Sequence, residues 1–101
     1  MITYQKGLLF IMSLSTIAKK ALKAKAHHLD PVILVGQKGI TPNLIQEVEI
    51  ALDHHELIKI KIQQGSKEVC TDFATQIAKA TDAEFITIIG RVLVFYRKKK
   101  E

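Results

Sequence analysis

The sequence predicts a single α/β domain in the order helix, strand, helix, strand, helix, strand, strand, with a four-stranded mixed sheet packed against the helices. Three observations predict this fold class. Apolar residues recur at helical spacing in three segments, and they alternate or run continuously in four shorter ones. Strands that alternate with helices favour parallel neighbours, whereas the last two strands flank a glycine and favour an antiparallel hairpin. With 101 residues, 48% of them apolar, the chain is long enough for one domain with its own core.

A first helix is expected over residues 14–28, where apolar and cationic residues separate onto opposite sides. Ser13 or Ser15 can cap its start. At 100° per residue, one arc carries the apolar residues Leu14, Ile17, Ala18, Ala21, Leu22, Ala24 and Leu29. The opposite arc carries Lys19, Lys20, Lys23 and His27. We therefore expect one side of this helix to dock on the core and the other to remain cationic and exposed.

A strand and a second helix follow the Asp30-Pro31 turn. The segment "VILV" at 32–35 is a continuous apolar run, which is typical of a strand covered on both faces. Thr41 can cap the second helix, and Pro42 suits its first position because the missing N–H costs nothing there. We expect its buried stripe to be Leu44, Ile45, Val48, Ala51 and Leu52.

The second half of the chain supplies three strands around a third helix. The alternation in "LIKIKI", residues 57–62, places Ile58, Ile60 and Ile62 on one face and Lys59 and Lys61 on the other. Ser66 can cap a third helix that ends at residues 81–83, with inward side chains expected at Val69, Phe73, Ile77 and, as further candidates, Cys70 and Ala74. The segments "EFITII" and "VLVFYR" flank Gly90-Arg91 as a hairpin. The order of the strands in the sheet does not follow from these patterns.

Charge is unevenly distributed along the chain. Fifteen Lys and Arg residues against ten Asp and Glu residues give a net charge of +5. The cations gather in the first helix, in the 36–39 loop and in the tail "RKKK" at 97–100. The acidic residues in the middle of the chain are Glu47, Glu49, Asp53 and Glu56. This segregation is expected if one face of the protein meets phosphates.

The loop Gly36-Gln37-Lys38-Gly39 has the ingredients of a phosphate contact. Two glycines allow close approach of a ligand to the backbone, Lys38 adds a positive charge, and a helix N-terminus follows. The spacing matches neither a Walker loop nor a dinucleotide fingerprint. KH domains use a G-x-x-G loop to clamp nucleotides, but their loop joins two helices. A plain strand-to-helix turn is the alternative that the motif alone leaves open.

Other chemistries find little support in the sequence. His27-His28 and His54-His55 lack the spacing of metal ligands, and His54 and His55 suit a helix C-terminus. Cys70 has no base nearby in sequence and is expected to be buried. A single cysteine excludes an intramolecular disulfide and fits a reducing cytoplasm. We therefore expect no enzyme activity, no metal or other cofactor, no small-molecule substrate and no membrane association.

The aromatic residues of the last strand lie on opposite faces. Core packing is expected for Phe95, and Tyr96 is either a core residue or a platform for base stacking. At the other end of the chain, the apolar run Leu8 to Met12 is too short to span a bilayer. Residues 1–13 are expected to be a flexible extension, with Met12 as an alternative start, or else an arm packed on the body.

Three segments, "LSTIAKKALKAKAHHLDPVILVGQKGIT", "ALDHHELIKIKI" and "IIGRVLVFYR", resemble the bacterial YhbY proteins. These consist of one CRM domain, named for chloroplast RNA splicing and ribosome maturation. The resemblance covers roughly Leu14 to Arg97 and does not include the residues before Met12. It implies an RNA-binding α/β domain similar to the C-terminal domain of translation initiation factor three. It also implies association with ribosomal RNA of precursors of the large (50S) subunit and a role in ribosome assembly.

The resemblance assigns the G-x-x-G loop to RNA binding, and the residues before it add a basic helix. We therefore expect the RNA-binding residues to be Gly36, Gln37, Lys38, Gly39, Lys19, Lys20, Lys23 and Arg91. We expect the helix and the loop to lie together on one surface of a cytoplasmic monomer, with 14–97 as the domain and 98–101 as a basic tail. The alternatives are a less selective DNA- or RNA-coating protein and an adaptor that docks other proteins through the acidic second helix.

Overall fold

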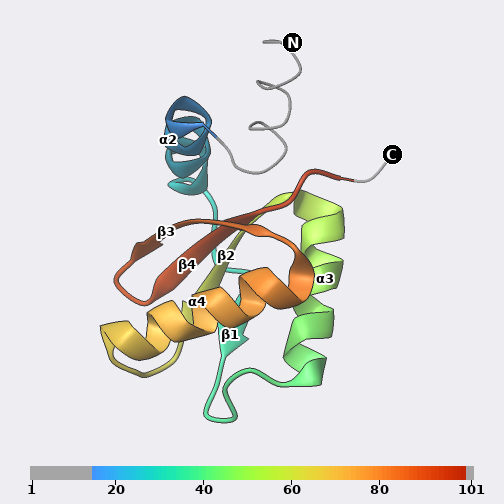
Figure 1. The fold of residues 1–101 in the computed structure, drawn as a ribbon, viewed down its shortest axis with the longest axis vertical. Coiled ribbons are helices and arrows are strands. Elements are labelled where there is room, and N and C mark those ends of the chain that lie inside the picture. The colour runs from blue at the N-terminus through green and yellow to red at the C-terminus, as the bar shows by residue number, and fades with distance from the viewer. Residues whose placement is uncertain (1–14, 100–101) are drawn as a thin grey trace, which may run out of the picture.

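The computed structural model describes residues 15–99 and shows an α/β fold (Figure 1). Its helices are α2 (Thr16–Ala26), α3 (Pro42–His55) and α4 (Lys67–Thr81). Its strands are β1 (Ile33–Val35), β2 (Leu57–Ile62), β3 (Glu84–Ile89) and β4 (Val92–Tyr96). This order is the one that the sequence predicts. The expected extension over residues 1–13 lies outside the described residues, as do residues 14, 100 and 101.

The four strands form one mixed sheet in the order β1-β2-β4-β3. β1 runs parallel to β2, with Val35 opposite Ile62, and β4 runs antiparallel to both of its neighbours. The mixed sheet, the parallel first pair and the antiparallel hairpin are all confirmed. The hairpin turns at Gly90, whose φ of 61° is easily adopted only without a side chain.

The helices cover the two faces of the sheet unequally (Figure 1). α3 and α4 pack on one face, where Ile58, Ile60 and Ile62 of β2 are buried as predicted. Their main contributions to this core are Val48, Leu52, Cys70, Ala74 and Ile77. α2 packs on the other face, where a smaller cluster joins Ala26, Leu57 and Val94. Full burial of a large apolar side chain is worth about 1.5–3 kcal/mol, so the α3–α4 face supplies most of the stability.

Hydroxyl caps begin all three described helices. Ser15 accepts a hydrogen bond from the Ala18 N–H at 3.1 Å, and Thr41 accepts one from Leu44 at 3.1 Å. Ser66 caps α4 in the same way. These caps agree with the sequence prediction, and Ser15 is the described one of the two candidates for the first helix. Each is worth about 1 kcal/mol.

The expected docking stripe of the first helix is wrong in detail. Ile17 is 81% exposed, whereas Lys19 is half-buried and faces the sheet. The residues that turn toward the sheet are Ala18, Lys19, Leu22 and Ala26. This stripe is rotated from the expected arc because most apolar residues of the helix are alanines, which give little preference for one face over the next.

The expectation that β1 is covered on both faces is also wrong. β1 is an edge strand, and Leu34 is 57% exposed on the face away from α3 and α4. Val32, just before the strand, is 50% exposed. A continuous apolar run does not distinguish a central strand from an edge strand, because the covering elements lie elsewhere in the chain. Val69, expected to point inward from α4, is 39% exposed, while Cys70 and Ala74 fill the core instead.

Candidate functional site

The glycine loop forms a tight turn between β1 and α3. The Gly39 N–H donates to the Gly36 carbonyl oxygen at 3.1 Å, which closes the turn directly before the Thr41 cap. Gln37 and Lys38 form the exposed tip. The loop therefore exposes its backbone and the side chain of Lys38 to solvent, close to the start of α3.

The two glycines of the loop have different roles. Gly39 adopts a positive φ of 68°, and a Cβ there would lie 3.5 Å from Cζ of Phe73. Gly36 has no such backbone requirement, and a Cβ there would lie 3.5 Å from the side-chain oxygen of Gln63. The backbone conformation of the turn therefore favours glycine at position 39. At position 36 the fold could accommodate a side chain, so a glycine there is not needed for folding.

A groove of about 480 Å³ runs along the loop and the first turns of α3. Its lining includes the whole loop together with Leu34, Thr41, Asn43, Leu44, Glu47 and Gln63. Glu47 places one carboxylate among these groups, so an anion would approach from the side of Lys38. This groove is referred to below as the loop groove.

Arg91 lies at the same end of the sheet as the loop. The Gln63 N–H donates to the Val35 carbonyl at 2.9 Å, and the Ile62 N–H donates to the Arg91 carbonyl at 2.7 Å. The ends of β1 and β2 and the start of β4 therefore meet here, and we call this the loop end. The structure brings Gly36, Gln37, Lys38, Gly39 and Arg91 together at this end.

The lysines of α2 lie at the opposite end, so the expectation of one shared surface is wrong. Lys19 pairs with Glu84 at 3.5 Å, and Glu84 lies opposite Tyr96, which lies opposite Leu57. The six-residue strand β2 separates this end from the loop end by roughly 17 Å. Figure 1 shows α2 and the loop between β1 and α3 at opposite ends of the view. Lys20 and Lys23 are exposed on α2, far from the loop.

The acidic residues of α3 serve the fold. Arg97, directly after β4, donates to Glu49 Oε1 at 2.6 Å, to Asp53 Oδ1 at 2.9 Å and to the Thr81 carbonyl at 2.7 Å. The Arg97 side chain is 14% exposed. This cation joins α3, the end of α4 and the end of β4, which removes Glu49 and Asp53 from a free acidic surface. The sequence groups Arg97 with the basic run at 97–100, and its carboxylate partners lie 44 and 48 residues away, too far for a local pattern to indicate them.

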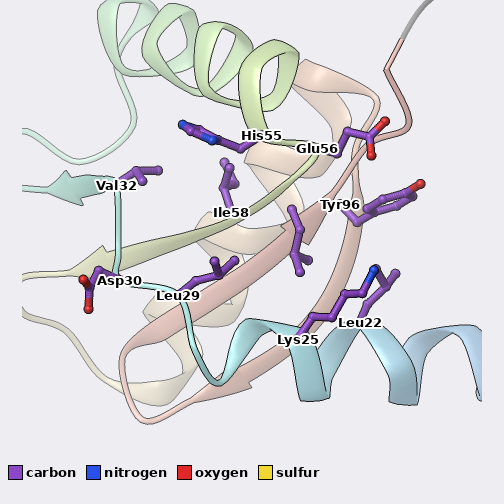
Figure 2. A pocket seen from close by; sticks show the side chains of 10 residues that line it. Leu22, Lys25, Leu29, Asp30, Val32, His55, Glu56, Ile58 and Tyr96 are labelled. Carbon is purple, nitrogen blue, oxygen red and sulfur yellow. The ribbon is translucent and has the colours of Figure 1, made fainter.

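An apolar cavity of about 560 Å³ lies near the end where α2 packs (Figure 2). Leu22, Leu29, Val32, Ile58 and Tyr96 supply much of its lining. Its charged and titratable lining residues are of both signs, namely Lys25, Asp30, His55 and Glu56. This cavity is larger than the loop groove, but a lining with charges of both signs does not favour binding of a polyanion. Tyr96 lies on this side, half-buried, whereas Phe95 is fully buried in the main core.

The histidine pairs and Cys70 form no candidate catalytic site. His54 and His55 end α3, and Glu56 follows with a φ of 62° and a carbonyl that accepts from the Arg97 N–H at 2.9 Å. Cys70 is fully buried, as predicted. Among residues 15–99, no group of three or more His, Cys, Asp and Glu side chains could hold a metal. No helix in this same range is long and apolar enough to cross a membrane.

Comparison with known proteins decides the family. The model of the CRS1/YhbY (CRM) domain matches residues 14–97. This chain belongs to the CRM family. A protein of Haemophilus influenzae named "RNA-binding protein" is 42% identical to this CRM chain over 89 residues, which are 88% of this chain and 90% of that protein. A Bacillus subtilis protein named "Probable RNA-binding protein YqeI" is 36% identical, over 82% of this chain and 86% of its own length.

A solved CRM relative has the same fold. The solution structure of a hypothetical protein from Staphylococcus aureus, described there as a candidate RNA-binding protein, superposes with a TM-score of 0.78 at 32% identity. The match covers 88% of this chain and 93% of that one. The compact α/β architecture predicted from the sequence is therefore shared with a family member.

Two cations at the loop end were not singled out from the sequence of this CRM domain. Lys61 lies opposite Leu34 and Val92 in the sheet, and Lys67 begins α4. In the sequence, Lys61 looks like a residue that keeps the exposed face of a strand soluble. Lys67 looks like an ordinary surface residue after the Ser66 cap. Only the strand order brings both to the end that holds the glycine loop.

Proposed function

We propose that this protein binds RNA through the loop end, and that its partner is ribosomal RNA in precursors of the large (50S) subunit. In this proposal it is a cytoplasmic monomer that assists assembly without catalysing a reaction. The observation that carries the proposal is the exposed G-x-x-G turn, which presents Lys38 beside a groove at the start of α3. The names of the CRM relatives as RNA-binding proteins support it.

The loop would act on the sugar-phosphate backbone. Gly36 carries no side chain to hold a strand away, and Lys38 supplies a mobile charge at the tip. Contacts of this kind position the protein but carry no sequence information, so specificity would come from RNA shape and the ribosomal context. Binding should accordingly weaken steeply with salt.

The α2 lysines would form a second contact region. Lys20 and Lys23 are exposed, whereas part of the charge of Lys19 is offset by Glu84. Because these residues lie roughly 17 Å or more from the loop end, they would meet a different part of the same large RNA. Such a two-region footprint suits a structured ribosomal RNA better than a short oligonucleotide.

Crosslinking in cells followed by sequencing of the bound RNA tests the proposed partner. The expected result is enrichment of large-subunit ribosomal RNA over messenger and transfer RNA, lost in a Lys38→Glu variant. Lys79→Glu on the exposed side of α4 is the matched charge reversal and should retain the enrichment. Recovery of RNA without preference for large-subunit ribosomal RNA would support the coating protein instead.

The adaptor alternative is weakened by the contacts of Arg97. Charge reversal at Glu49 or Asp53 would break the Arg97 network, so a loss of ribosome association would not distinguish a lost docking contact from a destabilised fold. Ile50, which is 53% exposed on α3, is the better probe of that face. Ile50→Ser should leave ribosome association unchanged if RNA is the partner.

A further inference from the structure

A second groove lies at the loop end, between the start of α4 and the β3–β4 turn. It has a volume of about 430 Å³ and is lined by Lys67, Cys70, Ile88, Gly90 and Arg91. Figure 1 shows the start of α4 beside that turn. The two charged residues of its lining are both cations, and they come from different elements. We call it the Lys67–Arg91 groove.

The position of Lys67 is unfavourable for the helix that carries it. Lys67 is the first residue of α4, where the helix dipole favours an anion and disfavours a cation. Its side chain is exposed and takes part in no ion pair among residues 15–99. Arg91 is likewise exposed and has no ion pair in the described range, in contrast to Arg97. Within residues 15–99, neither cation therefore stabilises the fold through an ion pair.

The two grooves lie close together along the end of the sheet. Val35 leads into the loop groove, Ile62 is its partner in β2, and the Ile62 N–H bonds to the carbonyl of Arg91. Two strand spacings therefore separate the backbone of Val35 from that of Arg91, which is about 10 Å. Lys61, next to Ile62, adds an exposed cation between them on the open face of the sheet.

We propose that a single-stranded segment of RNA passes from the loop groove to the Lys67–Arg91 groove, with its phosphates held by Lys38, Lys67 and Arg91. The inference rests on the proposed function and adds the path and the kind of RNA. Glu47 is the acid in the lining of the loop groove, and no acid lines the second groove, although Glu68 follows Lys67 in the sequence. A flexible single strand can follow this turn around the sheet, whereas a duplex cannot bend within about 10 Å.

The test compares Lys67→Ala and Arg91→Ala with Lys79→Ala, an exposed lysine of the same helix roughly 18 Å further along its axis. The measurement is the salt dependence of binding to a fluorescent single-stranded RNA of about twelve nucleotides. The slope is that of the logarithm of the binding constant against the logarithm of the salt concentration. Lys67→Ala and Arg91→Ala should each reduce its magnitude by about 0.7, and the double variant by about 1.4. Lys79→Ala should leave the slope unchanged.

Two results separate this inference from the function on which it rests. Unchanged slopes for Lys67→Ala and Arg91→Ala, with a reduced slope for Lys38→Ala, would overturn the second groove alone. A wild-type chain that binds no RNA would overturn the proposed function as well. Thermal unfolding serves as the folding control, and Lys67→Ala should unfold at the same or a higher temperature because it removes a cation from the start of a helix. Ultraviolet crosslinks to residues 63–67 and 90–92 are expected, and crosslinks confined to α2 would contradict the proposed path.

Discussion

The Nη1 atom of Arg97 lies 2.6 Å from Oε1 of Glu49, and this ion pair ties the end of the last strand to the middle of α3. Asp53, one turn further along α3, accepts from Nη2 of the same guanidinium. Arg97 also donates to the Thr81 carbonyl at the end of α4. One side chain after β4 thus binds partners on α3 and at the end of α4, two elements that are far from it in the sequence.

Replacement of Arg97 by Ala should destabilise the fold by about 1.5–3 kcal/mol, the range for hydrogen bonds to charged groups. The loss should not be larger, because Glu49 is 41% exposed and Asp53 is 65% exposed, so water can solvate the carboxylates left behind. Urea unfolding followed by circular dichroism measures the change. Arg97→Lys should recover only part of the loss, since an ammonium cannot reproduce the forked geometry. Full recovery would mean that charge alone, without that geometry, is sufficient.

The stabilisation by Arg97 should not depend on pH in the neutral and mildly alkaline range. Burial lowers the pKa of the Arg97 guanidinium. The hydrogen bonds and charges of Glu49 and Asp53 together raise it by more than burial lowers it, so the pKa lies above its ordinary value. A raised pKa gives stability that is present below the unfolded-state pKa and is lost as pH rises through the folded-state pKa. Because arginine in an unfolded chain loses its proton only above about pH 12, the difference between wild type and Arg97→Ala should be constant from about pH 7 to 10. Urea titrations at both ends of this range measure it, and a difference that shrinks at pH about 10 would contradict the assignment.

The two loop glycines should respond differently to alanine. Gly36→Ala should leave the unfolding free energy unchanged, because the new methyl meets Gln63 only at ordinary contact distance, but it should weaken RNA binding by blocking close approach. Gly39→Ala should cost about 1–2 kcal/mol, because its φ of 68° is strained for an L-residue. Paired measurements of urea unfolding and RNA affinity distinguish the two effects. Unaltered RNA affinity in Gly36→Ala would show that the backbone there is not approached closely.

RNA length should decide whether Lys20 matters. A stacked strand advances about 3.4 Å per nucleotide, so four stacked nucleotides span about 14 Å, which is less than the roughly 17 Å between the loop end and α2. Binding of a four-nucleotide RNA should be weakened by Lys38→Ala and unaffected by Lys20→Ala. Binding of a structured ribosomal RNA fragment should be weakened by both, with additive free energies because the sites are far apart. Fluorescence anisotropy measures both series, and an effect of Lys20→Ala on the short RNA would contradict the separation of the two regions.

Local patterns in the sequence were sufficient to predict the elements of this CRM domain. Ser15, Thr41 and Ser66 were recognisable as caps because a hydroxyl needs only the N–H groups three residues ahead. The alternation in β2 predicted its buried face for a similar reason, since side chains on a strand alternate whatever lies above it. The loop at 36–39 could also be placed between β1 and α3. Each of these features depends on contacts or periodicities within a few residues.

The arrangement of the candidate site depended on contacts between distant segments. Strand order put β4 between β2 and β3, which brought Arg91 to the loop end and left Leu34 on an open edge. The packing of α2 against the sheet put its lysines at the far end, against the expectation of one cationic surface. Arg97 found its partners 48 and 44 residues earlier in the chain. The sequence by itself determined which segments are helices and strands and where the glycine turn lies. Only the tertiary structure decided which charges share an end of the sheet, because pairing between distant strands leaves no periodic trace in the segments that it joins.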